Sequence, residues 1–138
     1  MEKAQKFIDE WKEDTLGTKP IFLSFCNDIF KYDKTKFEFY ERPGVSYSLR
    51  GIHMNQKDRP LFVMIDVIDD NPRQRWLSVC FYGDMIKDPD ELGDLIPEGL
   101  LGSDGYCFDI TEPDVYVKKY VSKRIHEAYE KAGINMEI

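Results

Sequence analysis

Arginine is concentrated in the middle of this chain, where five of its six arginines lie between positions 42 and 75. These five are Arg42, Arg50, Arg59, Arg73 and Arg75. A guanidinium group donates paired hydrogen bonds to a carboxylate or phosphate and also stacks on flat rings. With Lys57, the arginines outnumber the four aspartates of this segment, although the whole chain has a net charge of −7. Segment 42–75 is therefore the part of the sequence best suited to binding an anion.

Hydroxyl and aromatic side chains accompany these arginines. Ser46, Ser48 and Arg50 alternate with apolar residues, so they share one face of a predicted strand. The candidate ligand-binding residues are Ser46, Ser48, Arg50, His53, Asp66, Arg73, Arg75 and Trp76. They predict a sheet face that binds a small anionic ligand or the acidic tail of a protein partner. The alternative is a solvated face whose arginines pair with nearby aspartates.

Asp66 differs from the other acidic residues because it interrupts the apolar run Leu61–Ile68. A carboxylate in such a strand must pair, face solvent or take up a proton. Carboxyl groups with a perturbed pKa are common at functional sites. A small-molecule enzyme that uses Asp66 is therefore a second hypothesis beside the binding module, although the sequence does not locate a partner acid.

Composition and motifs argue against several other classes of function. A net charge of −7 disfavours contact with nucleic-acid phosphates and with anionic lipid, so nucleic-acid binding ranks third among the hypotheses. The acidic residues do not follow the EF-hand spacing. The glycine-rich segment 99–105 lacks the Lys-Ser/Thr of a phosphate-binding loop. We therefore expect neither a cofactor nor a metal site.

The three cysteines, Cys26, Cys80 and Cys107, form neither a CxxC pair nor a zinc-ligand spacing. The simplest interpretation is three reduced thiols in a cytoplasmic protein. The N-terminus opens directly into an amphipathic pattern without the apolar segment of a signal peptide. No apolar run reaches the roughly 18–20 residues that a membrane helix needs.

Hydrophobic periodicity predicts a single α+β domain over residues 1–138. An amphipathic helix spans Ala4–Trp11 and a second begins near Pro20. Strands follow at 36–40, 45–50, 61–68 and 76–82, and the almost continuously apolar segment 61–68 is expected in the centre of the sheet. A capping box at Asp88–Glu91 predicts a short helix, and a fifth strand at 106–110 precedes a long final helix. The expected order is α-α-β-β-β-β-α-β-α, in which about five antiparallel strands carry the terminal helices on one face.

Four segments also suggest a family: RPLFVMIDV, RWLSVCFYGDMIKDPDEL, GYCFDI and YVSKRIHEAYEKA. In this layout the chain resembles the small bacterial MmcQ/YjbR-type proteins over roughly residues 36–132. The resemblance implies a bacterial protein of unknown function with an α/β sandwich of frataxin-like shape. It supplies no catalytic residues.

Overall fold

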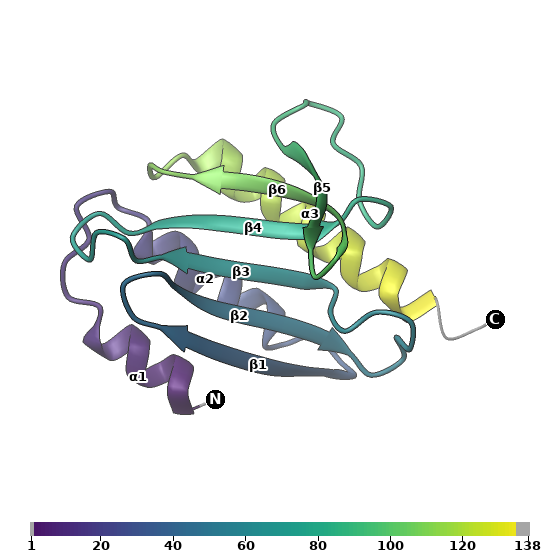
Figure 1. Cartoon of the computed structure of the whole chain (residues 1–138), viewed down its shortest axis with the longest axis horizontal. Coiled ribbons are helices and arrows are strands. Elements are labelled where there is room, and N and C mark those ends of the chain that lie inside the picture. Colours follow the sequence, from purple (N-terminus) through teal and green to yellow (C-terminus); the bar gives the residue numbers. More distant parts are fainter. Residues whose placement is uncertain (1, 135–138) are drawn as a thin grey trace.

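The computed structural model describes residues 2–134, which form three helices and one antiparallel sheet of six strands (Figure 1). The elements are α1 (Glu2–Glu10), α2 (Lys19–Ile29), β1 (Thr35–Arg42), β2 (Ser46–His53), β3 (Val63–Ile68), β4 (Trp76–Tyr82), β5 (Asp94–Leu100), β6 (Ser103–Ile110) and α3 (Val115–Ile134). The predicted α+β class with an antiparallel sheet is confirmed, and the sheet has one strand more than expected.

The strands follow the order β1-β2-β3-β4-β6-β5, and every neighbouring pair is antiparallel. The predicted central position of β3 is confirmed, because β3 has two strands on one side and three on the other. Its flanking partners are β2 and β4, which are its neighbours in sequence. In the β5–β6 hairpin, β6 pairs with β4, so β5 forms one edge of the sheet and β1 forms the other.

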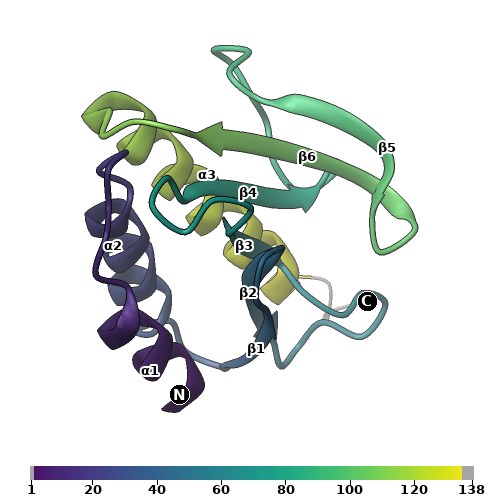
Figure 2. The ribbon, with the colours of Figure 1, turned by 60° about the vertical axis from the view of Figure 1, so that its left-hand side comes forward.

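All three helices lie on the same face of the sheet (Figures 1 and 2). The side chains of Leu49, Ile65, Val79 and Phe108 occupy directly opposed positions on four strands and point to this face, where each is almost completely buried. Because side chains alternate along a strand, the intervening residues point to the opposite face. We call this second surface, which no helix covers, the open face.

Aromatic rings join the helices to the sheet. The ring of Phe7 on α1 stacks on Tyr47 of β2 with 4.1 Å between ring centroids. At the other end of the sheet, the ring centroid of Tyr120 on α3 lies 6.0 Å from that of Phe108. Burial of such large apolar side chains supplies most of the free energy that holds the two layers together.

The helix predicted from Asp88 is absent, which corrects the expected element order. The Asp88 carboxylate does accept backbone N–H groups, but these are the N–H groups of Leu92 and Gly93, at 3.0 and 2.9 Å. Those two bonds close a turn. The hydroxyl groups of Tyr106 on β6 and Tyr120 on α3 donate to the same carboxylate and hold it in place. Residues 94–100 then pair with β6 as β5 instead of continuing a helix.

The glycine-rich segment 99–105 contains the hairpin turn between β5 and β6, together with the adjoining ends of both strands. Gly102 has φ +87°, a left-handed conformation that glycine adopts without steric cost. Leu100 is buried while the neighbouring Leu101 is exposed, so one leucine of this pair fixes the hairpin to the core.

The prediction of three reduced thiols is wrong for two of them. Cys80 and Cys107 are bonded in a disulfide between β4 and β6, and Cys26 alone is a free thiol. Burial raises the pKa of the Cys26 thiol to about 12, so this group stays protonated at neutral pH. Reduced cysteines therefore no longer support a cytoplasmic location, which stays a prediction.

Within residues 2–134, no helix has the length and apolar character required to cross a membrane.

Candidate functional site

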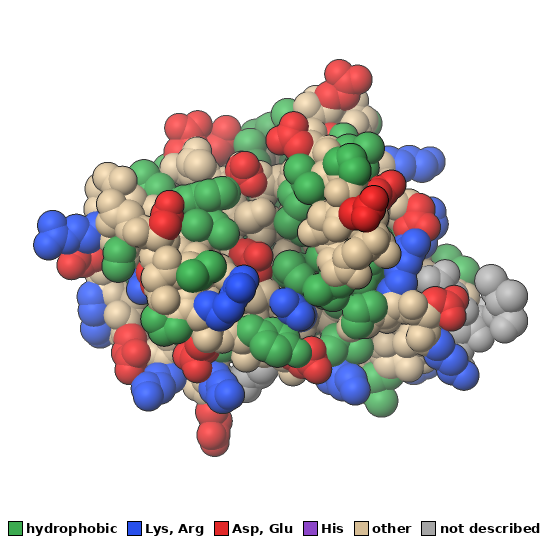
Figure 3. Space-filling model, in the orientation of Figure 1, with side chains coloured by type: hydrophobic (Ala, Val, Ile, Leu, Met, Phe, Trp, Pro, Cys, Tyr) green, Lys and Arg blue, Asp and Glu red, His purple; other side chains and the backbone are tan. Residues whose placement is uncertain are grey.

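The open face brings five of the predicted site residues onto one surface. Ser48 lies directly opposite Asp66, and Asp66 lies opposite Ser78 on β4. Ser46 belongs to the next row, which continues through Ile68 to Trp76. Directly opposed side chains on neighbouring strands are typically about 5 Å apart. Figure 3 shows this face, with basic and acidic side chains side by side near its middle and hydrophobic groups around them.

Asp66 is the most unusual group of the open face. Its Oδ1 atom is buried and makes no hydrogen bond within the described part of the chain. Burial raises the pKa of this carboxyl above its ordinary value, while the Ser48 hydroxyl and the guanidinium groups of Arg50 and Arg42 act in the opposite direction. The carboxyl group therefore sits at the centre of a partly dehydrated site that has positive charge nearby.

Arg50 and Arg42 lie on either side of the serine pair. The Arg50 guanidinium carbon lies 4.2 Å above the centre of the Tyr40 ring, and its Nε donates to Ser48 Oγ at 3.4 Å. Nη2 of Arg42 donates to Ser46 Oγ at 3.5 Å. Both contacts are long and involve neutral partners, so each guanidinium keeps its charge and has further donors without a protein partner among the described residues.

A comparison of all six arginines sets these two apart. Within residues 2–134, Arg59, Arg73, Arg75 and Arg124 each form an ion pair with a carboxylate, whereas Arg42 and Arg50 do not. Pairing with an aspartate, the alternative raised by the sequence, therefore holds for Arg59 and Arg75 and not for the two arginines of the open face. The two arginines without ion pairs lie on the surface that also carries Asp66.

Arg75 and Arg73, both predicted site residues, lie elsewhere. Arg75 points to the helix face, where its Nε binds Asp69 Oδ1 at 2.7 Å and its guanidinium lies 5.2 Å from the Phe7 ring centre. The Asp69 carboxylate also accepts the Gly44 N–H, so this ion pair joins the turns at one end of the sheet. Arg73 is exposed and pairs with Glu13. Alternation explains the error for Arg75, because it directly precedes Trp76 and must point to the opposite face.

His53, the third predicted residue outside the site, also points to the helix face. It is 4% exposed, and its Nδ1 accepts the Asn55 N–H at 3.0 Å. Its ring lies 5.1 Å from that of Tyr129 on α3. Burial lowers the pKa of this imidazole, with a further contribution from Lys34. His53 is therefore a packed core residue.

Two residues of the site were missing from the sequence prediction. Tyr40 lies opposite Ser48, and Arg42 lies opposite Ser46. The signal for both was present, since the period-two pattern of segment 36–42 assigns them to one side of their strand. What it does not indicate is the pairing register with β2, which decides that this side is the one that carries Arg50.

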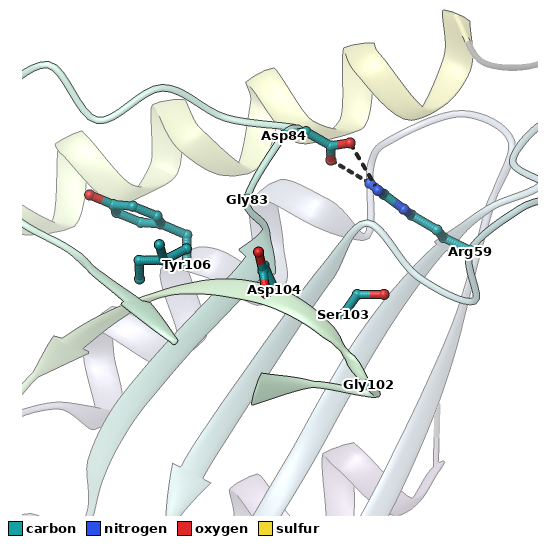
Figure 4. A pocket seen from close by; sticks show the side chains of 8 residues that line it. Arg59, Gly83, Asp84, Gly102, Ser103, Asp104 and Tyr106 are labelled. Carbon is teal, nitrogen blue, oxygen red and sulfur yellow. Dashed lines mark hydrogen bonds and ion pairs between the residues drawn. The ribbon is translucent and has the colours of Figure 1, made fainter. Parts of the chain in front are cut away.

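A hollow of about 550 Å³ lies at one end of the sheet, between the β5–β6 turn and the segments around Arg59 and Asp84. Arg59 forms a bidentate ion pair with Asp84 here. Its guanidinium carbon lies 4.6 Å from the centre of the Tyr82 ring. Figure 4 shows these two side chains joined across the hollow, while Tyr106 points away from them. The only arginine of this hollow is thus already neutralised by a carboxylate, which makes it a poorer anion site than the open face.

Among the described residues, no cluster of three or more His, Cys, Asp or Glu side chains is arranged to hold a metal ion. Comparisons with protein-family models, with curated proteins and with solved structures give no match. The resemblance to MmcQ/YjbR-type proteins is therefore untested and stays a prediction.

Proposed function

We propose that this protein is a binding module whose open face takes a small molecule bearing a carboxylate or phosphate. The observation that carries the proposal is that Arg42 and Arg50 are without ion pairs in the described chain and lie on one surface. Around them, the hydroxyls of Ser46 and Ser48 offer further donors to an anion. Arg42 lies directly opposite Ser46, and Arg50 follows Ser48 by two residues on the same strand, which supports a single compact site.

The rings on the same face indicate what else the ligand carries. Tyr40 is 44% exposed, and Trp76 is half-buried in the row next to that of Asp66. Exposed aromatic faces stack on flat groups, and an arginine already stacked on Tyr40 is pre-oriented for its anion. An anionic group attached to a planar ring fits this combination best.

The test is a titration followed by backbone amide NMR shifts, with inorganic phosphate and with benzoate as probes. We expect saturable shifts centred on residues 42–50 for at least one probe. Arg42→Ala and Arg50→Ala should each weaken binding at least about tenfold, since a hydrogen bond to a charged group contributes roughly 1.5–3 kcal/mol.

Arg73→Ala is the matched control because it removes the same charge from an exposed arginine that pairs with Glu13 away from the open face. The proposal fails if neither probe shifts these amides saturably, or if the Arg73 variant loses as much affinity as the other two.

Acid–base catalysis at Asp66 is a second candidate function. The specific observation is a raised pKa at a carboxyl group flanked by two serines and close to two arginines. Asp66→Asn distinguishes the two candidates, because the binding module retains or strengthens anion binding when this negative charge is removed. Loss of anion binding in this variant would contradict the binding module.

A further inference from the structure

The disulfide lies on the open face, on the side of the sheet opposite the helices. Cys80 and Cys107 are directly opposite each other on β4 and β6. The neighbouring opposed pair, Val79 and Phe108, points to the helix face and is almost completely buried. Cys80 is 8% exposed and Cys107 is half-buried, and both lie on the side of the sheet that no helix covers.

The bond joins two strands that are already paired. The ladder between β4 and β6 runs from Leu77 opposite Ile110 to Tyr82 opposite Gly105, and the cysteines lie within it. Breaking the disulfide therefore leaves the two sulfur atoms side by side, held by backbone hydrogen bonds on both sides. Two thiols held together in this way have a high effective concentration, which favours re-formation of the bond.

Negative charge flanks the two sulfur atoms. Asp94 on β5 lies directly opposite Cys107. Asp109 follows two residues after Cys107 on the same face and lies opposite Ser78, whose hydroxyl oxygen is 3.5 Å from the Cys80 sulfur.

The positive charge of the open face is more distant. In the row that contains the disulfide, Arg50 is separated from Cys80 by Met64, so their backbones are two strand spacings, or about 10 Å, apart. The Arg50 guanidinium also stacks on Tyr40, on the side away from the disulfide. Asp94 and Asp109 therefore lie closer to the disulfide along the sheet than Arg50 does.

We propose that Cys80 and Cys107 form a reversible thiol–disulfide exchange site that prefers low-molecular-weight thiols carrying a positive charge. This activity is separate from anion binding at Arg42 and Arg50. The aspartates attract an ammonium group and repel a carboxylate on the incoming thiol.

Exchange proceeds in two displacements. The thiolate of the small molecule attacks one cysteine sulfur, the protein S–S bond breaks, and its electron pair leaves on the other cysteine as a thiolate. A second thiolate attacks the mixed disulfide and releases the small-molecule disulfide. The two protons lost by the small thiols balance those taken up by Cys80 and Cys107. Two small thiols are oxidised and one protein disulfide is reduced.

The experiment measures the rate of reduction of the folded protein by cysteamine, 2-mercaptoethanol and 3-mercaptopropionate. Samples are quenched with an alkylating reagent and the modified cysteines are counted by mass spectrometry. Each rate is divided by the thiolate concentration and by the rate of the same thiol with 2-hydroxyethyl disulfide, which removes differences in intrinsic reactivity. We expect cysteamine to exceed 3-mercaptopropionate by roughly tenfold at low salt, with most of the preference lost at high salt.

The variant Asp94→Asn/Asp109→Asn should lose the preference, whereas Asp70→Asn, which removes an exposed acid in the β3–β4 turn, should keep it. The salt dependence of the unmodified protein provides the same test if the double variant does not fold. The proposal is overturned if all three thiols react in their reference ratio, if the bond resists thiols until denaturant is added, or if the protein purified without reductant contains three free thiols.

Discussion

Reduction of the Cys80–Cys107 disulfide should lower the stability of the fold without dismantling it. The bond closes a loop with a sequence separation of 27 residues. In the chain-entropy description, cross-linking a loop of this length restricts the unfolded chain by about 3.6 kcal/mol at 25 °C. For a chain of 138 residues, this corresponds to a fall of roughly 12 °C in Tm.

The native state should retain its structure on reduction, because the core lies on the other face of the same strands. Val79 and Phe108 stay packed under the helices, and the β4–β6 ladder continues on both sides of the cysteines. We therefore expect an unchanged far-ultraviolet circular dichroism spectrum below the melting temperature, together with an earlier unfolding transition.

The assay compares urea unfolding of oxidised and reduced protein by tryptophan fluorescence, since Trp11 is fully buried and reports the core. All samples carry Cys26→Ala, so that the third thiol does not exchange with the disulfide in the unfolded chain. Cys80→Ala/Cys107→Ala is the control, because dithiothreitol should leave its stability unchanged. Equal unfolding midpoints for the oxidised and reduced proteins would refute the reasoning, as would loss of the sheet upon reduction.

Two further predictions concern charged groups. Arg75→Ala leaves the Asp69 carboxylate, which is 5% exposed, without its partner and should lower the free energy of unfolding by about 3–5 kcal/mol; a loss in urea unfolding below about 1 kcal/mol would contradict this. Burial raises the pKa of Asp66 in the folded protein, so the folded state binds this proton more tightly than the unfolded state. The free energy of unfolding of the unmodified protein, measured relative to that of Asp66→Asn, should therefore increase as pH falls from 7 towards 4. A flat or opposite trend in urea unfolding would show that Asp66 is not dehydrated.

Much of the open face follows from local sequence. The alternation of Ser46, Ser48 and Arg50 with apolar residues assigns these three side chains to one surface whatever the neighbouring strands are. Asp66 falls on that surface through its pairing with Ser48. Periodicity depends on a few consecutive residues, which is why the positions of most helices and strands could be predicted.

The turn at Asp88 shows where local signals are insufficient. The sequence has the residues of a helix start, but the hydroxyl groups of Tyr106 and Tyr120 bind the same carboxylate from distant elements. Residues 94–100 then gain a strand partner in β6. Tertiary contacts outweigh a capping preference that contributes only about 1 kcal/mol.

The sequence by itself determined the fold class, the strand periodicity and the face on which Ser48 and Arg50 lie. Tertiary structure alone decided which arginines are without ion pairs and which cysteines meet. Cys80 and Cys107 are opposed because β4 pairs with β6 and not with β5, the next strand along the chain. Such pairings depend on the register between distant segments, which the pattern within either segment does not contain.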